Sequence, residues 1–161
     1  MSTLFDLAFY FAAPFWALMI LAPGWSWTRR IIGSPLMVLP VLVVWAIAAF
    51  PLLGPLWTAV VNPSLAGLQE LLADPAAVTL LWAQIIAWDL FIGHWMYLDS
   101  RERGLRPLVM SPLLVFTILL SPIGLPVYLA LRRTLHRPRL RHSAYSAEIR
   151  ASNAAKTRGV A

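Results

Sequence analysis

The sequence predicts an all-α integral membrane protein, a four-helix bundle whose fourth span is broken by proline and glycine. Of its 161 residues, 60% are hydrophobic and only 12% are charged. A soluble domain of this length has too little interior to bury so much apolar surface. The apolar residues also fall in four long blocks rather than in short alternating runs, which is typical of membrane-spanning helices.

Charge and cysteine content exclude several function classes. The net charge of +6 comes from arginines in two short loops and in the C-terminal stretch. This placement suits anionic lipid headgroups better than a DNA-binding face, so no nucleic-acid partner is expected. The chain has no cysteine, which rules out thiolate catalysis and cysteine-based metal sites. Its three histidines show no ligand spacing within any span, and neither a metal nor another cofactor is expected.

The first two spans are expected at residues 4–22 and 35–57. Each has about the length that a helix needs to cross the hydrocarbon core. The N-terminus lacks the basic segment of a cleavable signal, so the first block is interpreted as a span. Pro14 is expected to kink this span. Ser34 followed by Pro35 is a good start signal for the second span.

The third span is expected at residues 76–98 and is entered through Asp74 and Pro75, again a cap followed by proline. In the connector before it, residues 64–72 are expected to form a short helix at the membrane surface. Among the four spans, only this one has an ionisable residue near its middle, Asp89. A charge at that depth is costly. Asp89 is therefore expected either to have a function or to bind a backbone group freed by a helix break.

The fourth span is expected at residues 107–131, with a break in its middle. The sequence SPIGLP, residues 121–126, holds two prolines and a glycine, which break or sharply bend a helix. Backbone groups freed inside lipid need partners within the protein or in a wet cavity. The break is either a tolerated kink or the wall of a pocket, in which Pro122 and Gly124 would contact substrate. Residues 132–161 are expected to form a basic, partly disordered tail.

The arginines do not settle the orientation of a four-span chain. With the N-terminus outside, the two arginine-containing loops are cytoplasmic, as the positive-inside rule requires. These loops contain Arg29, Arg30, Arg101, Arg103 and Arg106. The five arginines between residues 132 and 141 then lie outside, which gives five against five. Either the rule fails, or one block does not cross, and the break at residues 121–126 is the place to look.

Candidate site residues cluster on the third span. Helical spacing places Trp82, Asp89 and Gly93 on one stripe. The glycine leaves a notch on this stripe for a neighbouring helix or a ligand. Tyr97 lies beside the stripe, about one turn beyond Gly93. We expect Asp89 to be the central residue of the site, with Trp82 and Gly93 contacting substrate.

Three further candidates lie on other sides of the same span. His94 is about 140° around the helix from Asp89, so the two cannot pair unless a ligand or a second helix lies between them. Trp95 belongs to a second, mostly aromatic stripe that suits a flat or polyene ligand. Asp99 lies at the membrane edge, where it has either a site role or a local ion pair at a solvated helix end.

Three segments carry a resemblance to a known family. They are APFWALMILAPGWSWTRRI, LLWAQIIAWDLFIGHWMYLD and LLSPIGLPVYL, which together cover about residues 13–130. The second segment is the most specific. The chain resembles the abscisic-acid-deficient 4-like family of the plant neoxanthin-synthesis protein, and specifically its bacterial relatives. The family usually has an arginine where this chain has His94, a departure that bears on which substrate is bound.

The resemblance implies a four-span protein that converts the epoxy-carotenoid violaxanthin into the allenic neoxanthin, or acts on a related isoprenoid. In this isomerisation an acid protonates the epoxide oxygen and a base takes a proton from the polyene. Burial disfavours the charged form of a carboxyl group, so Asp89 is the expected proton donor. His94, Tyr97 and Asp99 are the candidates for the base or for orienting the hydroxylated ring.

Two other functions are kept as alternatives. One is a non-catalytic, isoprenoid-binding accessory subunit of carotenoid enzymes. On this interpretation Asp89→Asn alters complex formation, and the chain shows no turnover. A small proton-coupled transporter predicts pH-dependent flux in liposomes, although carriers more often show repeated halves. The expected setting is a lipid bilayer, the bacterial cytoplasmic (inner) membrane. The expected partners are a hydrophobic isoprenoid or carotenoid ligand and either a second copy of the chain or a carotenoid enzyme.

Overall fold

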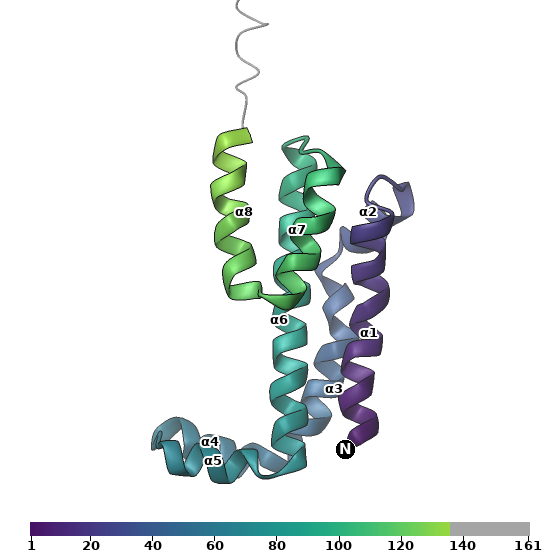
Figure 1. Ribbon diagram of the computed structural model, residues 1–161. Helices are drawn as coiled ribbons and strands as arrows, with labels where there is room; N and C mark the ends of the chain where they lie inside the picture. The colour runs from purple at the N-terminus through teal and green to yellow at the C-terminus, as the bar shows by residue number, and fades with distance from the viewer. Residues whose placement is uncertain (136–161) are drawn as a thin grey trace, which may run out of the picture. The chain divides into compact units, whose positions relative to one another are not determined.

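The computed structural model describes residues 1–135, and all regular secondary structure in that range is helical (Figure 1). The predicted all-α class is therefore confirmed for these residues. Contacts divide the chain into two units, Met1–Leu129 and Ala130–Ala161. The first unit contains every candidate site residue. Of the expected basic tail, residues 136–161 lie outside the described residues.

Three helical stretches of the described chain are long and apolar enough to cross a membrane: Ser2–Leu21, Pro35–Val61 and Pro75–Glu102. The first is helix α1, which contains Pro14 without being interrupted there. The third is helix α6, whose 28 residues extend about 42 Å. The first and third expected spans thus each correspond to a single helix, and their crossing of a membrane stays a prediction. Helix α6 ends where Gly104 adopts a φ of +67°, a backbone conformation that favours glycine.

The second stretch is a chain of short helices. These are η1 (Pro35–Val38), α3 (Leu39–Ala49), η2 (Phe50–Leu52) and α4 (Leu53–Val61). A proline lies at or next to the start of each of the first three helices. Because a proline removes a backbone donor, it interrupts what would otherwise be one longer helix. Figure 1 shows α4 turned aside from α3 and lying beside α5 (Leu65–Leu72). The short helix expected at residues 64–72 is confirmed as α5.

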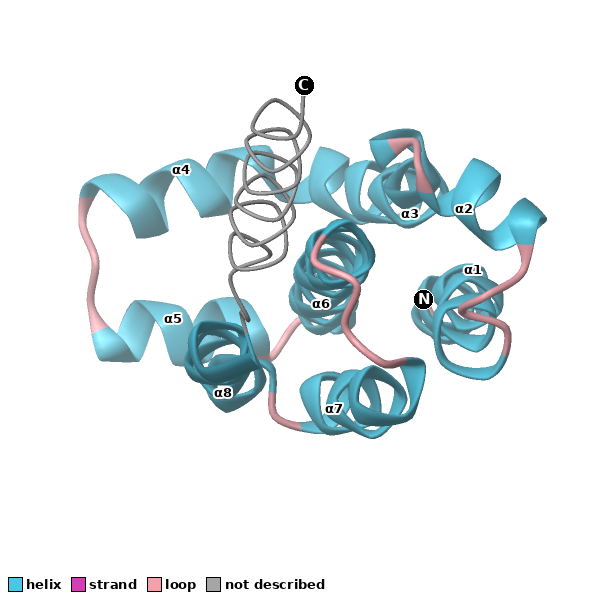
Figure 2. Cartoon of the chain, turned by 90° about the horizontal axis from the view of Figure 1, so that it is seen from above, coloured by secondary structure: helices cyan, strands magenta, loops and turns pink. Residues whose placement is uncertain are grey.

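Helix α6 lies at the centre of the first unit, with α1, α3 and α7 (Pro107–Leu119) packed against it (Figure 2). Ala8 of α1, Val44 of α3 and Ala83 of α6 form one buried cluster. Small side chains at such contacts let helix backbones approach closely, which favours association where lipid removes the hydrophobic driving force. The centre of the unit is therefore built around the helix that carries Asp89.

The four-helix bundle with one bent fourth span is not confirmed. Residues 107–131 form no single span, because the chain divides at Leu120 into α7 and α8 (Ser121–Leu135). Helix α7 has 13 residues and extends about 20 Å, less than a hydrocarbon core of about 30 Å. After Leu120 the chain turns back on itself, so that α8 begins beside the end of α7 (Figure 1). The expected kink is instead the turn of a helical hairpin.

Proline and glycine explain why this hairpin forms. Pro122 lies in the first turn of α8, where its missing N–H group is not needed, whereas inside a continuous helix it would remove a hydrogen bond. Gly124 packs directly against Thr117 of α7. A Cβ atom at Gly124 would lie 2.4 Å from Thr117 Oγ1 and 2.8 Å from Thr117 Cα. The close contact between α7 and α8 therefore requires a residue without a side chain at position 124.

Candidate functional site

Asp89 lies in the middle of α6 and is 9% exposed. Its carboxyl group shares a hydrogen bond with the side chain of Ser121, the first residue of α8. The first turn of a helix has unpaired N–H groups and a partial positive charge, which favour a carboxylate nearby. The break in the fourth stretch thus supplies the polar partner that a carboxyl group needs at this depth.

The notch at Gly93 is occupied by a side chain of the protein itself. A Cβ atom at Gly93 would lie 2.3 Å from the ring of Trp16 in α1, and Trp16 is buried. Trp82, on the same stripe, stacks on Phe5 with ring centroids 5.1 Å apart. Both contacts join α1 to α6. Gly93 and Trp82 therefore make packing contacts within the protein, while the Trp82 Nε1 atom is buried without a partner among the described residues.

Tyr97 is almost completely buried beside the C-terminal end of α1. Its hydroxyl donates a hydrogen bond to the carbonyl oxygen of Pro23 at 2.9 Å. Thr28 and Ser111 donate to two further carbonyl groups at the same end, each at 2.8 Å. The last carbonyl groups of a helix have no partner within it. The three hydroxyl groups close this end of α1 and hold it against α6 and α7.

His94 lies on a different side of α6 from Asp89, as the helical spacing predicts. Its ring forms a hydrogen bond with the backbone of Ile32, at the end of α2 (Ser26–Ile32). The ring also lies near Phe91, with centroids 6.2 Å apart. The His94 Nδ1 atom is buried and has no partner among the described residues. Nothing in these contacts connects His94 to Asp89.

Asp99 joins the C-terminal part of α6 to the middle of α8 (Ser121–Leu135). Its Oδ2 atom accepts a hydrogen bond from the Tyr128 hydroxyl at 2.5 Å and another from Arg103 Nε at 2.8 Å. Tyr128 belongs to α8 and is completely buried, and its ring meets Trp95 edge-on at 5.8 Å. Asp99 and Trp95 therefore hold α8 against the C-terminal part of α6, about 15 Å along the helix from Asp89.

The four candidate catalytic residues do not converge on one point. The contacts of Asp89 are with the start of α8, those of His94 with α2, those of Tyr97 with the end of α1, and those of Asp99 with Tyr128. What the arrangement offers chemically is one buried carboxyl group beside one hydroxyl group, next to the exposed ring of Pro122. Within residues 1–135 no group of three histidine, aspartate or glutamate side chains is placed to hold a metal ion.

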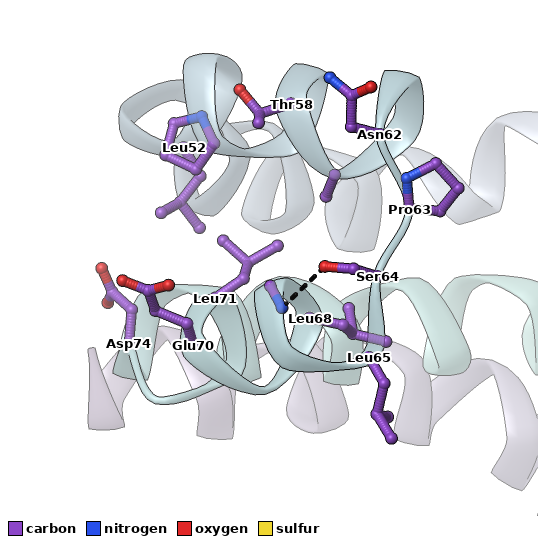
Figure 3. Close-up of a pocket in the computed structure, with 13 residues that line it drawn as sticks. Leu52, Thr58, Asn62, Pro63, Ser64, Leu65, Leu68, Glu70, Leu71 and Asp74 are labelled. Carbon is purple, nitrogen blue, oxygen red and sulfur yellow. Dashed lines mark hydrogen bonds between the residues drawn. The ribbon is translucent and has the colours of Figure 1, made fainter.

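A groove of about 940 Å³ lies elsewhere, between α4 and α5 (Figure 3). Leucines form much of its wall, with Asn62, Glu70 and Asp74 among the polar lining residues. No candidate site residue lines it. The carboxylate of Asp74 accepts a hydrogen bond from the backbone N–H of Ala76 at 2.7 Å, so it caps α6. The groove is the space between the two helices of a short hairpin, away from Asp89.

Sequence reasoning missed two residues that position the candidates. Ser121 belongs to the expected break but was not predicted to contact Asp89, and Tyr128 was not singled out. The two are seven residues apart, which places them on the same face of a helix. Gly124 lies on this face as well. The shared face of Ser121, Gly124 and Tyr128 can be recognised in the sequence only when residues 121–135 are taken as a separate helix rather than as the second half of a span.

Comparison with known proteins gives one match. The family model described as ABA DEFICIENT 4-like matches residues 3–128. This range includes all nine candidate site residues and also Ser121 and Tyr128. No curated protein and no solved structure matches the chain.

Proposed function

The chain belongs to the ABA DEFICIENT 4-like family, and on this premise we propose that it is a membrane isomerase acting on an epoxy-carotenoid or a related isoprenoid. The observation that carries the proposal is Asp89, a buried carboxyl group that shares a hydrogen bond with Ser121 at a helix break. Three helical stretches long and apolar enough to cross a membrane support a membrane location for this group. The proposed location is the bacterial cytoplasmic (inner) membrane, where such hydrophobic substrates dissolve.

The proposed reaction is an internal rearrangement. Asp89 gives a proton to the epoxide oxygen, and the carbon–oxygen bond nearer the polyene breaks, so that the oxygen becomes a hydroxyl group. A base then removes a proton from the adjacent polyene carbon, which forms the allene. One proton is given and one is taken, so the composition of the substrate does not change. A positioned general acid typically contributes about 10²- to 10⁴-fold to such a rate.

The side-chain contacts favour Asp89 as the group that acts in both proton-transfer steps. His94, Tyr97 and Asp99 each bind a partner that is not Asp89. After Asp89 has donated its proton, its carboxylate is the basic group nearest to the reacting atoms, and the hydrogen bond with Ser121 holds it in place. We therefore assign to Asp89 both the donation and the removal of the proton, and to Ser121 its orientation.

The test is an activity assay on membranes that contain the protein, supplied with a 5,6-epoxy-carotenoid. We expect a product of unchanged mass with altered retention time and absorption spectrum. Asp89→Asn is the critical variant, because it keeps the shape of the side chain and removes the acid. Product from the wild type alone supports the proposal. Product from both removes Asp89 from the mechanism, and product from neither contradicts the isomerase.

One observation favours a second candidate, a non-catalytic isoprenoid-binding subunit of carotenoid enzymes. The partners of His94, Tyr97 and Asp99 tie helices to one another instead of lining a common site. In that case the assay gives no product, and an isoprenoid copurifies with the chain. A carotenoid enzyme or a second copy of the chain is then the expected protein partner. Asp89→Asn then changes complex formation, and neither the wild type nor the variant turns over substrate.

A further inference from the structure

The direction of α8 is determined by side-chain contacts within the first unit. Its first residue, Ser121, contacts Asp89 in the middle of α6, and Tyr128 contacts Asp99 near the end of α6. Helix α8 therefore runs in the same direction as α6. Helix α7 runs the opposite way, because Ser111 near its start donates a hydrogen bond to Ile20 at the end of α1. The turn at Leu120 separates two antiparallel helices.

The depth of this turn follows from the position of Asp89. Asp89 precedes Asp99 by ten residues, which corresponds to about 15 Å along α6. A hydrocarbon core is about 30 Å thick. The turn between α7 and α8 thus lies about halfway through a core that ends near Asp99. Nine residues of α8 then return the chain to the level of Asp99 at Tyr128 and Leu129.

Charges are divided between the two ends of the first unit. The hydrogen bond from Tyr97 to Pro23 shows that the C-terminal ends of α1 and α6 lie together. Every arginine of residues 1–129 belongs to this end, and there is no lysine in that range. At the opposite end the charged side chains are acidic. They are Asp6, Glu70 and Asp74, and all three are exposed.

We propose that the chain crosses the membrane three times and that α7 and α8 form a re-entrant hairpin, which enters and leaves the bilayer on the arginine side. The partner of the arginine end is then an anionic, cytoplasmic leaflet, to which arginines next to a span are attracted. Polar groups at the break of the hairpin lie inside the membrane but have partners within the protein: Ser121 shares a hydrogen bond with Asp89, and the N–H group of Gly124 donates to the carbonyl oxygen of Leu120 at 2.8 Å.

Three crossings also resolve the conflict in the arginine count. With four crossings, the five arginines between residues 132 and 141 lie on the side of the membrane opposite the five arginines of the loops. With a re-entrant hairpin, the chain after α8 emerges on the side of the two arginine loops. The five arginines between residues 132 and 141 then join the other five, and the positive-inside rule is obeyed throughout. This inference concerns sidedness alone and does not depend on the proposed isomerase activity.

Cysteine labelling tests the proposal cleanly, because the chain has no cysteine of its own. Single exposed residues are replaced by cysteine, one in each variant. A membrane-impermeant maleimide is then added to sealed vesicles of either orientation. Glu102→Cys reports the arginine end, Gln69→Cys reports the acidic end, and Thr134→Cys reports the end of α8. All three side chains are exposed, so folding is expected to be retained.

We expect Thr134→Cys to be labelled from the same side as Glu102→Cys, and Gln69→Cys from the opposite side. Labelling of Thr134→Cys from the side of Gln69→Cys means that the chain crosses four times and overturns the proposal. Arg133→Cys, also exposed, serves as a second reporter if the Thr134 variant does not accumulate. Labelling of Gln69→Cys and Glu102→Cys from one side would equally overturn it.

Discussion

Two carboxyl groups on α6 each bind a hydroxyl group of α8, but their surroundings differ. Asp99, near the end of the helix, also accepts a hydrogen bond from Arg103, so its charge is matched by a cation. Asp89, in the middle, binds Ser121 and has no ion pair among the described residues. A neighbouring cation offsets the cost of burying a charged carboxylate, and Asp89 has no such cation among the described residues.

The difference between the two surroundings suggests that the contact of Asp99 is structural and that the contact of Asp89 serves the proposed reaction. The bond between Asp99 and Tyr128 holds α8 against α6. The bond between Asp89 and Ser121 lies where a proton donor would be needed to open an epoxide away from water. Variants that remove one contact at a time test whether this separation is correct, because those near Asp99 should alter stability and those at Asp89 should alter turnover.

The largest loss of stability is expected from Gly124→Ala, which disturbs both contacts at once. The added Cβ atom would meet the backbone of Thr117 at 2.8 Å, and backbone atoms cannot rotate away. We expect a cost of about 2 kcal/mol, as for overpacked cores, measured by thermal unfolding in detergent. Gly54→Ala in α4 is the matched control, because nothing lies within 4 Å of that position. Equal losses in the two variants would contradict the close contact.

A smaller loss is expected from Tyr128→Phe. The ring contact with Trp95 remains, but Asp99 loses one of its donors. Hydrogen bonds to charged groups contribute about 1.5 kcal/mol or more, so we expect a decrease of about that size in the unfolding free energy. Tyr10→Phe is the control, since Tyr10 is 67% exposed. The assignment of Tyr128 fails if the two substitutions are equally mild.

Tyr97→Phe is expected to cost about 1 kcal/mol, because it leaves the carbonyl group of Pro23 without its donor. Turnover of an epoxy-carotenoid should stay within a few-fold of the wild type, since Tyr97 contacts the end of α1 and not Asp89. Unfolding and turnover are measured on the same preparation. A loss of turnover at unchanged stability would show that Tyr97 takes part in the reaction.

The smallest effect is expected from Arg103→Ala. Arg103 is exposed and forms its ion pair with Asp99 within one turn of helix. Such exposed pairs contribute little to stability and are screened by salt. Unfolding at low and at high ionic strength, with Arg106→Ala as a control, should show a slight deficit that salt removes. A large loss of stability that persists at high salt would mean that the ion pair with Arg103 contributes far more to the fold than an exposed pair should.

Much of the fold was predictable because it depends on local patterns. Helices α1 and α6 follow from apolar length, and the starts of η1 and α6 follow from a cap followed by proline. The break at Ser121 was equally visible. Its consequence was not, because a break in one helix leaves both a kink and a full reversal possible. The reversal depends on Gly124 meeting Thr117, a contact between two helices that no local pattern specifies.

The candidate site was predictable only in part, for the same reason. Asp89 was identifiable from its depth in an apolar span, and its separation from His94 followed from helix geometry. The occupation of the Gly93 notch by Trp16 and the bond between Tyr97 and Pro23 depend on how α1 packs against α6. The five arginines between residues 132 and 141 were the sequence signal that conflicted with four crossings, and together with the break at residues 121–126 they pointed to the hairpin.

The most direct test compares Asp89→Asn with Asp99→Asn in the epoxy-carotenoid assay, on membranes that contain equal amounts of each variant. We predict that Asp89→Asn lowers the rate of product formation by at least about 100-fold, the smaller contribution of a general acid. Asp99→Asn should remain within a few-fold of the wild type. Full activity of Asp89→Asn, or an equal loss in both variants, would contradict the claim that Asp89 alone carries the chemistry.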